Sequence, residues 1–172
     1  MFILNKFGMA VILILLLLIS CLSDLGHMKG WREPGSSEAG EGWRSKDVNR
    51  YLVVKGDFNG DGIMDEARLL VRTKGDGMGL FVFISQKDHK FQTFLLDEIR
   101  EKDFIQVMGI SKIKPGRYKT ACGKGYWECR NGEVPEILIK NDSLDYFKFE
   151  SANSYFFWDE KSEKFKRVWI SD

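Results

Sequence analysis

The chain has 172 residues, of which 44% are hydrophobic, and its formal net charge is +1 at pH 7. That length allows one domain with a sizeable hydrophobic core. Positive and negative residues are nearly balanced and interspersed. We therefore expect no nucleic acid as partner, because nucleic-acid-binding domains carry a marked excess of lysine and arginine.

The first residues have the pattern of a secretory signal. Lys6 is the only charged residue before a run of apolar and small residues from Phe7 to Ile19. These thirteen residues are too few for a membrane-spanning helix, which needs about 20, but they suit the apolar region of a signal peptide. Removal of residues 1–20 would take away only Lys6 and lower the formal net charge from +1 to 0.

The apolar run ends in Leu-Ile-Ser-Cys, residues 18–21, which resembles the lipobox of bacterial lipoproteins. The resemblance implies that residues 1–20 are a signal peptide and that Cys21 becomes an N-terminal residue carrying lipid such as palmitate. Leu22 in the next position, where an aspartate would favour the inner membrane, implies sorting to the outer membrane with the protein facing the periplasm. Ordinary secretion with an unmodified Cys21 is the alternative.

Residues 21–46 are rich in Gly, Ser, Glu and Pro and have no sustained apolar period, which predicts a flexible tether. Trp31 and Trp43 are unusual residues for a tether, and Trp43 is a candidate for the start of the fold. The remaining residues, 47–172, are expected to form one β-rich domain.

Two short strand-like runs, within residues 51–58 and 67–73, flank a loop crowded with side-chain oxygens. Calcium takes six to eight hard oxygen ligands, and this loop offers three carboxylates, an amide and a backbone carbonyl. Gly62 permits a turn with positive φ. The cation would neutralise the repulsion between the carboxylates. The candidate ligands are the side chains of Asp57, Asn59, Asp61 and Asp65 and the carbonyl of Ile63.

The run from Asp57 to Asp65, DFNGDGIMD, resembles the calcium loop of FG-GAP/VCBS repeats, which closes a β-hairpin. The resemblance implies the ligand set given above and a structural Ca²⁺. The sequence departs from that family in two ways, because Glu66 replaces the usual aliphatic residue and the chain contains a single copy of the unit. A turn stabilised by Asp and Asn side chains without metal is the alternative.

The rest of the chain repeats short apolar runs between turn residues, the pattern of a mainly β protein. We expect strands within residues 79–85, 91–99, 103–110, 116–122, 134–140, 145–151, 154–160 and 164–171. The spacing predicts an antiparallel sheet, a sandwich or a small barrel, with the calcium-loop hairpin and at most one short helix. Residues 93–104 are the alternative helix. The last two runs predict a hairpin that turns at residues 160–163.

Cys122 and Cys129 are left as a pair if Cys21 carries lipid, and no histidine lies near them in sequence. An oxidising compartment favours a disulfide, which would contribute about 2–3 kcal/mol to stability on the chain-entropy model. The closed loop carries Tyr126 and Trp127. Rigid aromatic side chains of this kind suit recognition of a protein or a sugar. In the alternative, Trp127 folds back onto the core.

No catalytic motif is recognised in the sequence. His89 lies in a charged turn, and Glu98, Glu101 and Asp103 are better explained as a solvated face than as paired catalytic carboxylates. We expect a non-enzymatic, calcium-binding envelope lipoprotein, with the membrane and an unknown envelope protein or glycan as partners. The alternative is a periplasmic inhibitor or immunity lipoprotein that blocks a lytic enzyme or toxin. A calcium-dependent hydrolase is a minor alternative.

Overall fold

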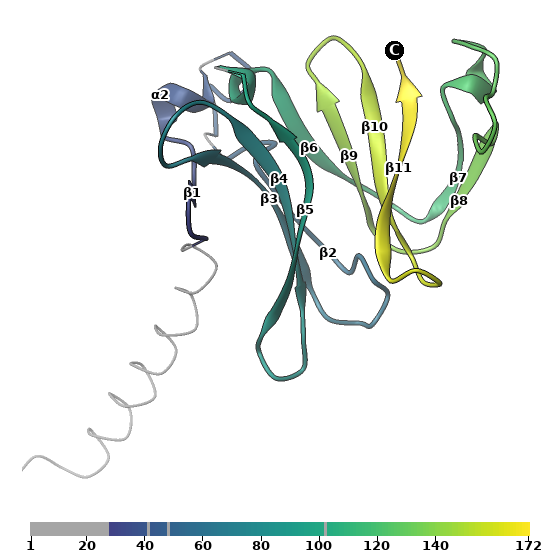
Figure 1. The fold of residues 1–172 in the computed structure, drawn as a ribbon, viewed down its shortest axis with the longest axis horizontal. Helices are drawn as coiled ribbons and strands as arrows, with labels where there is room; N and C mark the ends of the chain where they lie inside the picture. The colour runs from purple at the N-terminus through teal and green to yellow at the C-terminus, as the bar shows by residue number, and fades with distance from the viewer. Residues whose placement is uncertain (1–27, 41, 48, 102) are drawn as a thin grey trace, which may run out of the picture.

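The computed structural model describes residues 28–172 apart from residues 41, 48 and 102. These residues form a mainly β protein with antiparallel sheets and only short helices, as the sequence predicts (Figure 1). No helix in this part of the chain is long and apolar enough to cross a membrane. The predicted signal peptide and Cys21 lie outside the described residues.

One sheet, here called sheet A, contains β2 (Val53–Gly56), β3 (Asp65–Arg72), β4 (Met78–Ser85) and β5 (Phe91–Ile99) in consecutive antiparallel hairpins. A short strand, β1 (Trp31–Arg32), also pairs with β3. Nearly every side chain of β4 is buried, because apolar residues occupy both faces of this central strand. Sheet A is therefore covered on its inner face and, in part, on its outer face.

The second sheet, sheet B, has the order β11-β10-β9-β6. Its strands are β6 (Met108–Ile113), β9 (Ser143–Lys148), β10 (Asn153–Asp159) and β11 (Lys164–Ser171). The two sheets meet where β6 lies beside the start of β2, and the Ile110 N–H donates to the Tyr51 carbonyl at 2.9 Å. Their inner faces enclose one core, which includes Phe58, Leu69, Leu80 and Leu144.

The opposite edges of the two sheets, β5 and β11, approach each other through side chains. Arg167 pairs with Asp97 at 3.2 Å, and the Phe94 ring makes edge contacts with Trp158 and Phe165. These contacts close the side of the core that lies opposite the β2–β6 junction. Among the described residues, the hydroxyl of Tyr146 is the one buried side-chain nitrogen or oxygen atom without a hydrogen-bond partner.

A small third sheet, with β7 (Gly116–Lys119) and β8 (Glu136–Ile139), packs on the outer face of sheet B (Figure 1). Tyr118 from β7 contacts Tyr155 from β10 with ring centroids 5.4 Å apart. Phe156, the next residue along β10, faces the core and is buried. The alternating aromatic residues of β10 therefore pack on both faces of sheet B: one face packs against the core and the other against the third sheet.

The strand expected within residues 91–99 is confirmed, and the alternative helix is wrong. Residues 93–104 do not form a helix, since β5 continues to Ile99 and is followed by a 3₁₀ turn, η2 (Phe104–Gln106). The pairing of β5 with β4 overrides the local helical pattern. The predicted terminal hairpin is confirmed, because β10 and β11 pair directly and are joined by a turn at residues 160–163.

The described part of the expected tether is packed against the domain. Trp31 is buried on the outer face of sheet A, where its ring meets Phe81 at 4.9 Å. A single helical turn, α2 (Ser36–Ala39), follows and buries Ala39. Arg44 is only 1% exposed and donates to five backbone carbonyls. These acceptors belong to Ala39, Arg50, Ile105, Gln106 and Met108.

Candidate functional site: the acidic β2–β3 loop and the disulfide loop

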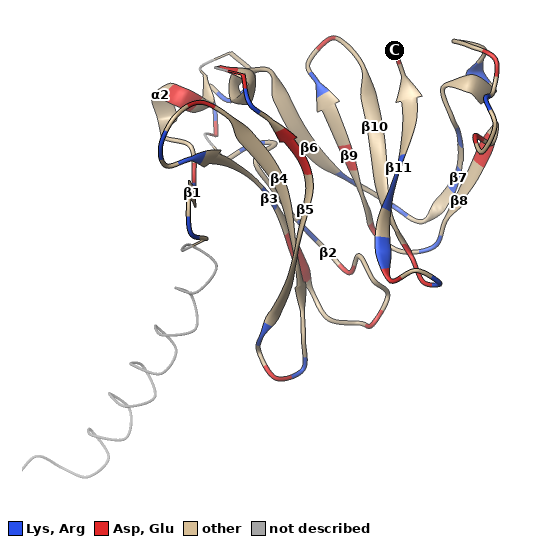
Figure 2. Cartoon of the chain, in the orientation of Figure 1, with Lys and Arg blue, Asp and Glu red and all other residues tan. Residues whose placement is uncertain are grey.

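The acidic loop closes a β-hairpin. Strands β2 and β3 pair up to Gly56 and Asp65, and the intervening residues form the turn (Figure 2 shows its acidic residues in red). Gly60 and Gly62 have φ of 80° and 82°, a left-handed conformation that glycine adopts without steric strain. The flanking elements are strands, as the sequence predicts, and the loop is therefore not an EF-hand.

The loop is wrapped around the carboxylate of Asp57. Its Oδ1 accepts the N–H groups of Gly60 at 2.8 Å and Asp61 at 3.1 Å. Its Oδ2 accepts the N–H of Gly62 at 2.9 Å. Asn59 and Asp61 form similar local bonds, since Asn59 Oδ1 accepts the Asp61 N–H and Asp61 Oδ1 accepts the Ile63 N–H. These backbone donors hold the side-chain oxygens in a compact turn and offset part of their mutual repulsion.

Asp65 closes the loop from the side of β3 and is 1% exposed. Its Oδ2 accepts the N–H of Phe58 and its Oδ1 accepts the N–H of Ser85, each at 2.9 Å. Burial raises the pKa of Asp65 above its ordinary value. The two backbone hydrogen bonds oppose this shift, and the negative charges of Asp61 and Asp57 add to it. The three carboxylates therefore interact, and a nearby cation would favour the charged form of Asp65.

The carboxylates of this loop could hold a hard cation only together with other oxygen ligands of the loop and water. Among the described residues, no group of three or more His, Cys, Asp and Glu side chains could hold a metal ion by itself. A cation here would also need oxygens from the Asn59 amide, the Ile63 carbonyl and water, which is the mixed oxygen set that calcium accepts. Asp57 and Asp65 retain acceptor capacity, because an ionised carboxylate has about four lone-pair sites.

The loop also contacts a turn from the other sheet. A methyl group placed on Gly60 would lie 2.7 Å from Oδ1 of Asn141, between β8 and β9. At Gly56 the same substitution would lie 2.9 Å from the side chain of Asp142, which accepts a bond from Lys112. Sequence reasoning did not find this contact, because about 80 residues separate its two sides and no local pattern connects them.

The structure contains the disulfide between Cys122 and Cys129, whose Cα atoms are 4.9 Å apart. Tyr126, at the tip of the closed loop, is 54% exposed. Trp127 is half-buried and lies back against the domain, where its Nε1–H donates to Oε2 of Glu133 at 3.1 Å. A hydrogen bond from the Arg130 N–H, followed by the bond from Trp127 and the charge of Arg130, lowers the pKa of Glu133.

A shallow cavity of about 20 Å³ separates this loop from the end of β11 and includes Trp127, Val134 and Trp169 in its walls. Trp169 is itself 42% exposed. The disulfide loop and β11 therefore present a surface with several accessible aromatic and aliphatic side chains. The sequence did not indicate Trp169 as a binding residue, because its strand has the pattern of an ordinary strand in the terminal hairpin.

The structure does not bring the other sequence candidates together as a catalytic group. His89 occupies an exposed turn between β4 and β5 with φ of 63°. Glu98 lies on β5 and pairs with Arg72 and Arg100. Glu101 and Asp103 line a separate cavity of about 220 Å³ beside the β3–β4 turn.

Comparisons with protein-family models, with curated proteins and with solved structures find no match.

Proposed function

We propose that this chain is a calcium-stabilised, lipid-anchored protein of the bacterial cell envelope whose β-domain binds another macromolecule without catalysing a reaction. The observation that carries the calcium proposal is the β2–β3 loop. It places Asp57 and Asp61 in the turn and Asp65 at its β3 end, where Asp65 is buried and accepts two backbone N–H groups. The anchor proposal depends on the lipobox-like sequence ending at Cys21.

Calcium binding is tested by thermal unfolding. A ligand that binds only the folded state, at a hundredfold excess over Kd, raises the free energy of unfolding by about 2.7 kcal/mol. For a domain of this size, that corresponds to a rise in Tm of roughly 5–10 °C. Calcium should be titrated to at least about 10 mM, because extracellular modules often bind in the range of about 0.1–1 mM and a hundredfold excess over a Kd of about 0.1 mM requires that concentration. Magnesium should stabilise less, since it loses its waters reluctantly.

The Asp61→Ala variant should lose the calcium-dependent rise in Tm. Asp76→Ala is the matched control, because Asp76 also lies in an exposed Gly-Asp-Gly turn of the same sheet, and it should keep the full rise. A wild-type Tm that responds neither to calcium nor to a chelator would contradict the metal site and leave a hydrogen-bonded acidic turn.

The anchor is tested in cells with a radioactive or clickable fatty acid. Wild-type protein should incorporate the label and sediment with membranes, with the outer-membrane fraction as the expected location. Cys21→Ser should remove both properties. A wild type that is secreted without label would show ordinary secretion instead.

The second candidate function, inhibition of a lytic enzyme or toxin, is favoured by one observation. The disulfide loop holds Tyr126 outward while Trp127 is fixed by Glu133, which is a suitable shape for insertion into a partner's cleft. Crosslinking in envelope extracts should capture a partner with wild type and much less with Tyr126→Ser. Leu138→Ser is the matched control, because Leu138 is also 54% exposed. Equal capture by both variants would place the binding surface elsewhere.

A further inference from the structure

The outer face of sheet A carries an apolar surface that the N-terminal segment covers in part. Met28 and Trp31 pack there against Leu70, Phe81 and Phe83. The covering stops at β5, whose Leu95 pairs directly with Phe81 and is 48% exposed. We call the exposed apolar residues of this strand, Phe91 and Leu95, the β5 strip; half-buried Met28 lies on the same face of sheet A.

The members of this strip share one face. Residues directly opposite each other on paired strands point to the same side of a sheet. Phe91 is opposite Ser85, and Leu95 is opposite Phe81. A methyl group on Gly79 would lie 3.1 Å from both the Leu95 and the Trp31 side chains, which shows that Leu95 converges with the N-terminal segment. Phe91 is 39% exposed and extends the apolar surface toward the β4–β5 turn.

The packed N-terminal segment shortens the distance between the domain and Cys21. A free tether from Cys21 to Lys46 could extend by about 85 Å, at roughly 3.4 Å per residue. Because the chain is already packed at Met28, only the seven steps from Cys21 to Met28 remain, which span at most about 25 Å. A lipid at Cys21 would therefore hold the face that contains Met28 close to the bilayer.

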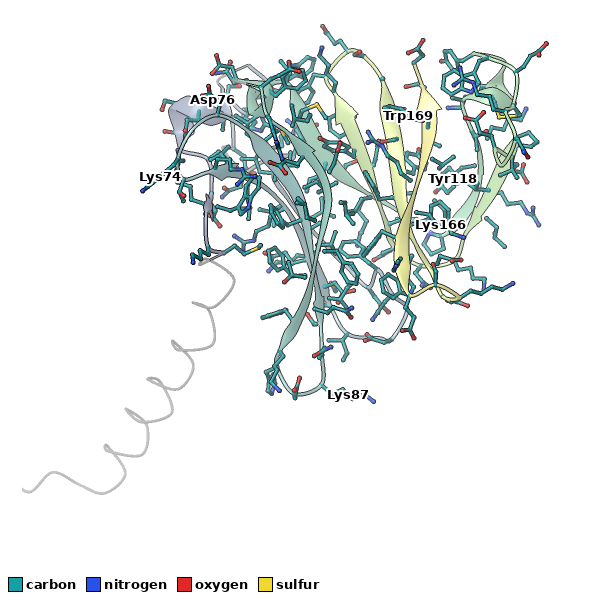
Figure 3. All side chains as sticks on the ribbon, in the orientation of Figure 1. Lys74, Asp76, Lys87, Tyr118, Lys166 and Trp169 are labelled. Carbon is teal, nitrogen blue, oxygen red and sulfur yellow. A yellow bond between two sulfur atoms is a disulfide. The ribbon has the colours of Figure 1, made fainter. Side chains whose placement is uncertain are left out.

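Basic side chains border the β5 strip. Exposed Lys87 and Lys90 lie in the β4–β5 turn together with Asp88, which pairs with Lys90 at 2.7 Å, and exposed Lys29 follows Met28. The turn therefore has one more lysine than acidic residues. Figure 2 shows this turn with basic residues in blue on both sides of an acidic stretch in red, and Figure 3 places Lys87 at the tip of the hairpin, far from Trp169. Apolar side chains bordered by lysines complement the interfacial region of a bilayer with anionic headgroups.

We propose that the β5 strip rests on the lipid surface that holds the anchor, so that the disulfide loop faces away from the membrane. This inference depends on the proposed lipidation of Cys21. It adds an orientation, a contact surface and a partner, namely the headgroup and upper acyl region of an anionic phospholipid bilayer. Partial insertion of Phe91 and Leu95 removes apolar surface from water, and this burial favours the docked orientation.

The test uses the full lipidated protein, purified from membranes and reconstituted into vesicles of phosphatidylethanolamine and phosphatidylglycerol. Lysines are labelled briefly with an amine-reactive reagent, and the rate at each site is measured by mass spectrometry. Lys87 and Lys90 should react about tenfold more slowly than in detergent, which corresponds to a docking preference of about 1.4 kcal/mol. Lys119 and Lys161, which are exposed elsewhere, should react equally in both.

Leu95→Asp should restore fast labelling of Lys87 and Lys90 while the protein stays on the vesicles. Leu138→Asp, at another exposed leucine, should leave the protection intact. Unchanged lysine rates on vesicle-bound wild type would overturn the orientation but not the anchor. Protection that persists in detergent and grows with protein concentration would show a second copy on the strip and would overturn lipid docking. Failure to remain on vesicles would overturn both proposals.

Discussion

Replacing Arg44 with methionine should destabilise the whole domain, although this residue lies in a segment with the composition of a tether. The guanidinium is 1% exposed and satisfies carbonyl oxygens from the N-terminal segment, from η2 and from the start of β6. Methionine fills similar space but donates no hydrogen bond. The variant therefore isolates the loss of donors from the loss of volume.

The magnitude follows from the acceptors left behind. A hydrogen bond to a charged group contributes about 1.5–3 kcal/mol, and a buried carbonyl without a donor costs about 1–3 kcal/mol. Arg44 serves five carbonyls, and those near the surface regain water. If two of these carbonyls remain buried without a donor, the free energy of unfolding should fall by about 3–5 kcal/mol. This corresponds to a fall in Tm of roughly 10 °C.

The assay is urea and thermal unfolding of the mature chain, followed by tryptophan fluorescence. Arg117→Met is the matched control. Arg117 pairs with Glu136 at the surface, and exposed ion pairs contribute at most about 1 kcal/mol. If Arg44→Met and Arg117→Met unfold at the same urea concentration, the buried network has no stabilising role and the reasoning fails.

Two further predictions concern local geometry and pH. Gly60→Ala and Gly62→Ala introduce the same left-handed strain, but of these two glycines only Gly60 faces Asn141. The Gly60→Ala variant should therefore be less stable than Gly62→Ala by about 1 kcal/mol or more. Equal melting temperatures of the two variants would contradict the contact between the loop and Asn141. The Arg32 side chain and the Gly35 N–H hold the pKa of Glu38 at about 2, below its ordinary value of 4.5. The contribution of Glu38 to stability should therefore be present above pH 4.5 and lost as the pH falls toward 2. An NMR titration of Glu38 with a midpoint near 4.5 would disprove that pairing.

Most of the strands were predictable, because their signals are local. Apolar runs between glycine- and aspartate-rich turns coincide with β2 to β5 and with β8 to β11. The disulfide pair follows from counting cysteines once Cys21 is set aside. The loop from Asp57 to Asp65 was also visible, since its candidate ligands lie within one turn. The helix alternative for residues 93–104 failed because sheet pairing, which is not visible locally, determines the conformation there.

The role of residues 28–46 could not be predicted from composition. Gly, Ser and Pro disfavour long helices and strands, and the segment accordingly forms turns around the single helical turn α2. The order instead comes from a few anchors with distant partners. Trp31 contacts β4, and Arg44 bonds to carbonyls more than 60 residues away. The unusual tryptophans were the available signal, but nothing in the sequence identified their partners.

The distant bonds of Arg44 also set the order in which the chain can fold. Strands β2 to β5 are joined by short hairpins, so sheet A needs only local loop closure and can form early. Arg44 must wait until η2 and the start of β6 are in place, because its acceptors are there. The segment that is synthesised first among the described residues is therefore completed late. Its docking connects the N-terminal segment to η2 and β6, so we expect it among the last steps of folding.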